Sequence, residues 1–125
     1  MADTLTCTIS IEKNGQQLPG FPIVRRVSVD EMVTFATERA NADGVFSAPS
    51  GLTALDSVTF FYYTADQITK ILFDGNSDAT APLEIAANGL VILVNPTIDS
   101  GASTNITVEN DSGSTALLTG VAGGT

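Results

Sequence analysis

The chain has 125 residues, the usual size of one domain, with five Lys and Arg against fourteen Asp and Glu and no histidine. The formal charge of −9 argues against nucleic acid as a partner, because phosphate binding depends on clustered cations. Without histidine, Ser-His and Cys-His nucleophile pairs and imidazole metal ligands are excluded. We therefore expect one domain with no catalytic residues, no cofactor and no metal.

The cysteine count and the apolar runs predict where the protein folds. Lone Cys7 cannot form an internal disulfide, and the first residues lack the basic and apolar segments of a secretory signal. These features predict folding in a reducing cytosol. The longest uninterrupted apolar run, residues 90–94, is far shorter than the roughly 20 residues that a membrane helix requires, so no membrane partner is expected.

The first part of the chain has the pattern of a β-hairpin. Residues 4–13 alternate with period two, which places four apolar residues on one face of a half-buried strand: Leu5, Cys7, Ile9 and Ile11. Cysteine on such a face usually behaves as a small hydrophobic residue. Asn14-Gly15 supplies the positive φ angles of a tight turn, and the proline-containing stretch 18–22 predicts an irregular edge.

Residues 23–56 give weaker signals. A second extended segment is predicted at 23–29, and its Arg25-Arg26 pair reads as two solvated or ion-paired side chains. Residues 30–40 fit either a short helix capped by Asp30 or a strand, and the β-branched residues in this segment favour the strand. Residues 41–56 are rich in Ala, Ser, Gly and Pro and predict a long loop.

The rest of the chain predicts short strands separated by turns. Residues 57–63 form a clear strand with aromatic residues on both faces, which indicates burial on both sides, and residues 68–73 are its expected hairpin partner. Further strands are expected at 83–85, at 90–94 up to Asn95-Pro96, at 105–109 and at 115–121, followed by a linker-like 123–125 tail. The predicted fold is all-β: a single antiparallel β-sandwich or jelly roll of about seven to eight short strands spanning residues 1–125.

Three local patterns suggest sites, and each has a simpler structural explanation. Residues 74–78 resemble the start of a calcium loop, but Ala79 and Ile85 stand where that loop needs glycine and glutamate. The pair Tyr62-Tyr63 could stack on a sugar, although packing is the favoured role in a chain without tryptophan. The sequons at Asn105 and Asn110 are expected to be chance matches in a cytosolic protein.

The second half of the chain, residues 58–124, resembles small structural proteins of tailed-bacteriophage virions. The similarity lies in the strand, turn and strand of residues 60–75, the short strand at 83–85, and the apolar strand after Asn88-Gly89. It is strongest in residues 105–116 and in the final strand, which ends in Ala122-Gly123-Gly124. The resemblance implies a β-sandwich that is made in the host cytoplasm and mounted on a virion, commonly as a trimer. The resemblance does not assign a function to any individual residue of this chain.

The resemblance and the composition together predict a capsid decoration or cement protein that binds copies of itself and the major capsid protein. Only 15% of the residues are charged and the mean hydropathy is +0.23, which suits a surface buried against neighbours. The contacts are expected in residues 1–4 and 41–56, with Val45 and Phe46 at the centre of the second segment. The alternatives are a tail, baseplate or fibre component, a carbohydrate-binding module, and, third, an enzyme.

Overall fold

The computed structural model describes residues 2–73, 82–98 and 106–125, and these residues are all-β, with no α-helix among them. The strands pair antiparallel throughout. In chain order, the elements are β1 Asp3–Ile9, β2 Glu12–Lys13, β3 Gln16–Gln17, β4 Ile23–Val29, β5 Glu31–Arg39, the 3-10 turn η1 Leu52–Ala54, β6 Val58–Ala65, β7 Thr69–Leu72, β8 Leu83–Ile85, β9 Leu90–Ile98, β10 Thr107–Glu109 and β11 Ala116–Gly124.

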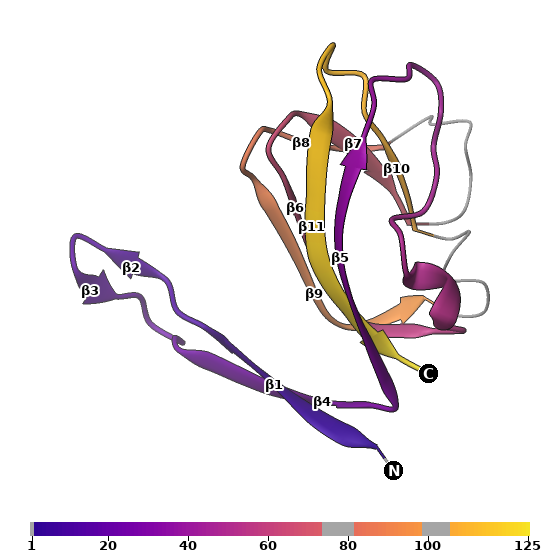
Figure 1. Cartoon of the computed structure of the whole chain (residues 1–125). Helices are drawn as coiled ribbons and strands as arrows, with labels where there is room; N and C mark the ends of the chain where they lie inside the picture. The colour runs from indigo at the N-terminus through magenta and orange to yellow at the C-terminus, as the bar shows by residue number, and fades with distance from the viewer. Residues whose placement is uncertain (1, 74–81, 99–105) are drawn as a thin grey trace.

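Two sheets pack face to face and form the body of the molecule (Figure 1). One sheet has four strands in the order β5-β11-β6-β9, and the other has three in the order β10-β7-β8. Side chains of alternating positions fill the space between the sheets, as period two requires. The expected all-β sandwich is therefore confirmed, with seven strands of the described residues in its two sheets.

The core is centred on aromatic side chains of β6. Phe61 and Tyr63 are fully buried, and their rings lie nearly parallel, 6.3 Å apart. Phe35 of β5 and Phe73 complete the aromatic cluster around Phe61. Aromatic pairs at these separations add stabilisation beyond their buried area. The remaining buried members of the core are Leu52, Leu55, Val58, Ala65, Ile71, Ile85, Ile98, Ile106, Val108, Ala116, Leu118 and Ala122.

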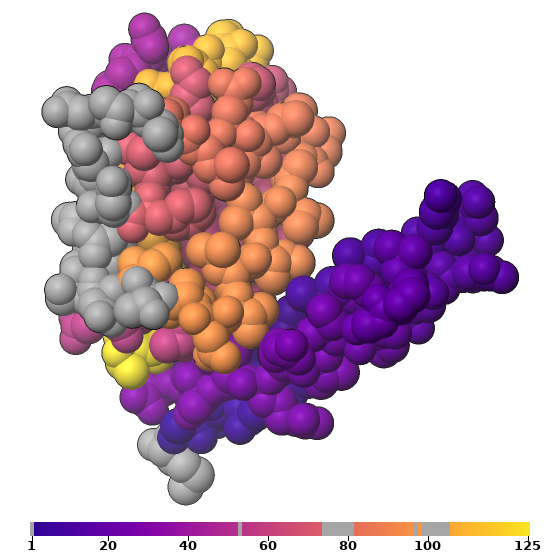
Figure 2. All heavy atoms as spheres, turned by 180° about the vertical axis from the view of Figure 1, so that it is seen from behind, coloured from indigo at the N-terminus to yellow at the C-terminus, as the bar shows by residue number. Residues whose placement is uncertain are grey.

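A long hairpin, which we call the arm, stands outside this sandwich (Figure 1). It comprises residues 3–29, with β1 paired to β4 over seven residue pairs and the small β2-β3 ladder at its tip. The predicted tight turn at its tip is confirmed, because Asn14 and Gly15 have φ angles of 53° and 78°. The arm meets the body near the end of β11 and then extends away from it (Figure 2).

The uncertain segment at residues 30–40 is a strand. Strand β5 pairs with β11 along nine residues, and Phe35 faces the core. The β-branched residues that argued against a helix are accommodated on this pleated surface.

The predicted hairpin of residues 57–63 with 68–73 is wrong. Strands β6 and β7 belong to different sheets, because β11 and β9 occupy both edges of β6. The turn after Ala65 carries the chain from one sheet to the other. Its Asp66 carboxylate accepts the Leu117 backbone N–H at 2.8 Å, which ties the turn to β11.

Strand β9 continues past the expected stop at Asn95-Pro96. Asn95 has a φ of 55°, and the pairing register with β6 shifts at this point, as in a β-bulge. Pro96 is tolerated because β9 is an edge strand, where the missing N–H does not interrupt a ladder.

The linker-like end of the chain is part of the sheet. Gly123 and Gly124 pair with β5 on one side and with β6 on the other. Thr125 also bonds through its backbone to Ser57. The sequence pattern failed here because glycine is depleted in strands unless another chain segment approaches closely, which is the case at Gly123.

Candidate interaction surface

The outward side of the four-stranded sheet, which we call the outer face, is apolar over much of its area. Strand β9 presents Leu90 and Ile92, both exposed, and β11 presents exposed Leu117 and half-buried Val121. A sheet that packs on one side only normally turns polar residues outward. This face therefore departs from the pattern of a water-facing sheet.

The base of the arm covers one end of the outer face. Val27 and Val29 of β4 are each only 3% exposed there, although the arm beyond them is open to solvent. A Cβ atom on Gly123 would lie 2.8 Å from Val29 Cγ1, so only glycine allows this approach. The Asp30 backbone N–H also donates to the Gly124 carbonyl at 2.9 Å. Together these contacts fix the base of the arm on β11.

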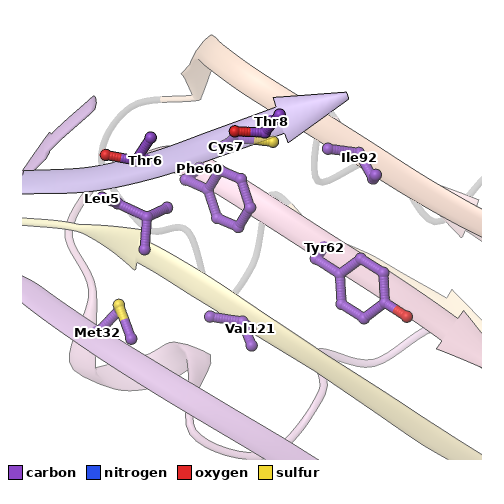
Figure 3. A pocket seen from close by; sticks show the side chains of 9 residues that line it. All are labelled: Leu5, Thr6, Cys7, Thr8, Met32, Phe60, Tyr62, Ile92 and Val121. Carbon is purple, nitrogen blue, oxygen red and sulfur yellow. The ribbon is translucent and has the colours of Figure 1, made fainter. Parts of the chain in front are cut away.

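An open cleft of about 430 Å³ lies between the arm and the outer face. Figure 3 shows the side chains of β1 on one side of it and those of the sheet on the other. The residues that line the cleft are Leu5, Thr6, Cys7, Thr8, Met32, Phe60, Tyr62, Ile92 and Val121. None of them is a carboxylate, a lysine or an arginine, so the cleft suits an apolar partner surface.

A group of acidic side chains lies in the body, at the loops that follow β5 and β10. Carboxylate oxygens of Asp43, Glu109 and Asp111 lie within 4.8 Å of one another. The Lys70 ammonium is 3.0 Å from Asp111 Oδ2 and 3.7 Å from Glu109 Oε1. The hydrogen bond and the charge of Asp111 raise the pKa of Lys70. The Gly44 backbone N–H donates to Glu109 Oε2 at 2.6 Å, so buried Glu109 already has its partners.

Arg39 and Asn110 strengthen the same region. The Arg39 guanidinium donates to the carbonyls of Ser47 at 2.9 Å and Ala48 at 3.0 Å, and also to that of Val108. Burial lowers the pKa of Arg39. The buried Asn110 side-chain amide donates to the carbonyls of Arg39 and Ser114. These bonds join β5, β10 and the loop between β5 and β6, so Arg39 and Asn110 have a structural role here.

The loop at residues 41–56 is confirmed as a loop with the short turn η1, but much of it is anchored. Ser47 pairs with Val108, and Leu52 and Leu55 are buried in the core. Of the two residues predicted to make contacts, Val45 is exposed and Phe46 is half-buried.

The structure separates the other residues that the sequence suggested as sites. Tyr62 borders the cleft while Tyr63 lies in the core, so the two rings do not form one platform. The Asn110 sequon is occupied by internal hydrogen bonds, whereas Asn105 and the calcium-like stretch 74–78 lie outside the described residues. Cys7 is half-buried, as its strand face predicted, and it lines the cleft.

The sequence reasoning missed the cleft as a whole. The signal that could have revealed it was that β6 has aromatic residues at both its odd and its even positions. This pattern indicated that both faces of the strand are packed, but not what covers the face opposite the core. Phe60 and Tyr62 face the cleft, and their alternates Phe61 and Tyr63 face the core.

No helix in the described part of the chain is long and apolar enough to span a membrane. No family model, curated protein sequence or solved structure matches this chain.

Proposed function

We propose that this protein is a non-enzymatic structural subunit that works by binding copies of itself and neighbouring proteins in a phage virion. Its specific role in this proposal is to decorate or cement the head shell, as a trimer in contact with the major capsid protein, after synthesis in the host cytoplasm. The observation that carries the proposal is the exposed apolar outer face beside a projecting arm. The resemblance of residues 58–124 to virion proteins is the reason for proposing a phage virion as the assembly.

The character of the polar clusters also supports a binding role. Glu109 and Asn110 are occupied by bonds within the fold, and the cleft has no charged lining residue. A surface of this kind buries apolar area against a partner, which is the main source of association free energy.

The test measures the mass of the purified protein by light scattering and its binding to phage heads stripped of their decoration proteins. We expect a closed oligomer that rebinds the heads. A monomer that ignores the heads and binds sugars on a glycan array would overturn the proposal and leave the carbohydrate-binding module in its place.

A tail, baseplate or fibre component is the second candidate, and the arm favours it. A projecting hairpin gives each subunit two unlike surfaces, and contacts between unlike surfaces can build open stacks as well as closed rings. Copy number separates the two roles, because a head decoration protein is present in many more copies per particle than a component of the tail tip.

A further inference from the structure

The arm and the rest of the chain carry opposite formal charge. Residues 3–29 contain three of the five cations and two of the fourteen acids, a net charge of +1, while the remaining residues carry −10. In the described residues, neither Arg25 nor Arg26 belongs to an ion pair, and both are exposed. The cations of the arm are therefore available to a second molecule with an acidic body.

The arm also has an apolar face that projects beyond its own body. Cross-strand pairing places Leu5 with Val27, Cys7 with Arg25 and Ile9 with Ile23, all on one face of the hairpin. Val27 is buried at the base of the arm, whereas Ile9 and Ile23 are only half-buried and pair at the far end of the β1-β4 ladder. The arm extends away from the body in this direction (Figure 2). An isolated two-stranded hairpin is marginally stable in water, so this end gains from a covering surface.

The outer face offers such a surface on the part that its own arm leaves open. Leu90 is 57% exposed, and Leu117 is exposed on β11 beside Glu38 of β5. The acid and the leucine share this face because they are register partners. One apolar patch thus includes Arg25, and the other includes Glu38.

We infer that the arm of one copy lies across the outer face of a second copy, with the Ile9-Ile23 end on Leu90 and Leu117 and Arg25 facing Glu38. This inference rests on the proposed function in taking self-association as the mode of action. It adds the surfaces, the charge pair and the direction of the contact. Because arm and face are unlike surfaces, the contact can close as a ring or as a reciprocal exchange between two copies, or continue as an open stack.

The main experiment reverses one charge on each side and measures the association constant by sedimentation and light scattering. Arg25→Glu is expected to weaken association about tenfold or more, because it brings like charges together at the contact. Adding Glu38→Arg to the same chain should restore most of the loss. Arg26→Glu is the matched control: it makes the same charge change on the opposite face of the arm and should leave association near the wild-type value.

Three outcomes would overturn the inference: equal effects of Arg25→Glu and Arg26→Glu, no rescue by Glu38→Arg, or a wild-type protein that stays monomeric. Circular dichroism checks that each variant is folded. These results separate the inference from the proposed function. If the oligomer binds heads and Arg25→Glu does not weaken its association, only the arm contact is contradicted. If association depends on the arm but the oligomer does not bind heads, only the virion role is contradicted.

Cross-linking between different chains gives a second, independent readout. In a Cys7→Ser background, a chain with Ile23→Cys is mixed with a chain with Leu117→Cys and oxidised, so any heterodimer is intermolecular. The control places the new thiol at Leu83, which is exposed on β8 of the other sheet. We expect a disulfide with the Leu117 variant and little with the Leu83 variant. Equal yields, or none with either, would contradict the contact.

Discussion

The body and the arm show two ways in which the same kind of strand can be stabilised. In the body, every second side chain of β6 enters a core that includes Phe61, Tyr63 and residues of both sheets. In the arm, buried side chains occur only where Val27 and Val29 meet the body, and residues 10–20 are all exposed. The body therefore contains its own hydrophobic stabilisation, while the arm depends on its base and on whatever covers its far end.

The largest expected effect is a cavity in the core. Phe61→Ala should lower the free energy of unfolding by about 3–5 kcal/mol, because the ring is fully buried among three other aromatic rings. Ile11→Ala in the exposed part of the arm should change it by less than about 0.5 kcal/mol. Denaturant unfolding at low protein concentration measures both. Similar losses in the free energy of unfolding for Phe61→Ala and Ile11→Ala would contradict the conclusion that the body and the arm are stabilised differently.

The next effect lies at the junction of arm and body. Gly123→Ala should cost about 1–3 kcal/mol and speed amide exchange in β1 and β4, because the new methyl group displaces Val29. Val29→Ala in the same chain removes the opposing methyl groups and should return part of the stability. A loss in the double variant equal to the sum of the two single losses would show that these residues do not meet.

The third effect depends on pH. Burial raises the pKa of Tyr63 above its ordinary value of 10.0, although the hydrogen bond with Thr69 and the charge of Arg39 act in the opposite direction. The folded protein keeps this phenol protonated where the unfolded chain would release the proton. The contribution of Tyr63 to the free energy of unfolding is therefore fully present below about pH 10, and it is lost as the pH rises through the raised pKa.

Lys70 contributes in the same window. Its raised pKa means that the stabilisation from its charge is present below its ordinary value of 10.5 and is lost above it. Melting temperatures from pH 7 to 11 should thus decline at the alkaline end, and Tyr63→Phe should make that decline shallower. A decline of unchanged slope in the variant would mean that Tyr63 does not contribute to it.

The smallest expected effect is that of calcium. The Lys70 ammonium and the Gly44 N–H already occupy the carboxylates of Glu109 and Asp111, so millimolar calcium should leave the melting temperature unchanged. The same titration with Lys70→Met tests whether the ammonium is what keeps a cation away. A rise in the wild-type melting temperature would contradict the structural role of this group.

The sequence predicted the body better than the surfaces around it. Alternation and turn residues located most of the strands, including those of the hairpin that forms the arm, because a period of two and an Asn-Gly turn are local properties. The pairing of β6 was mispredicted, since it depends on β11, more than fifty residues later in the chain. Sheet partners at such separations leave no local pattern.

The cleft escaped prediction for a related reason. Alternation shows that Phe60 and Phe61 point to opposite sides, but it does not show which side holds the core. The arm base covers one end of the outer face only because Gly123 and Val29 meet, and a glycine in a sequence gives no sign of what approaches it. The outer face thus becomes recognisable only in three dimensions.

The position of β11 affects how the protein is made. This strand is the last of the described chain, yet it lies between β5 and β6 and pairs with both. During synthesis, β5 and β6 therefore leave the ribosome long before the strand that joins them. Sheets closed by such distant pairing form slowly. The arm is complete at an early stage, whereas the surface to which we assign it is built only once β11 has been made, so a nascent chain presents its arm before it presents the face that receives one.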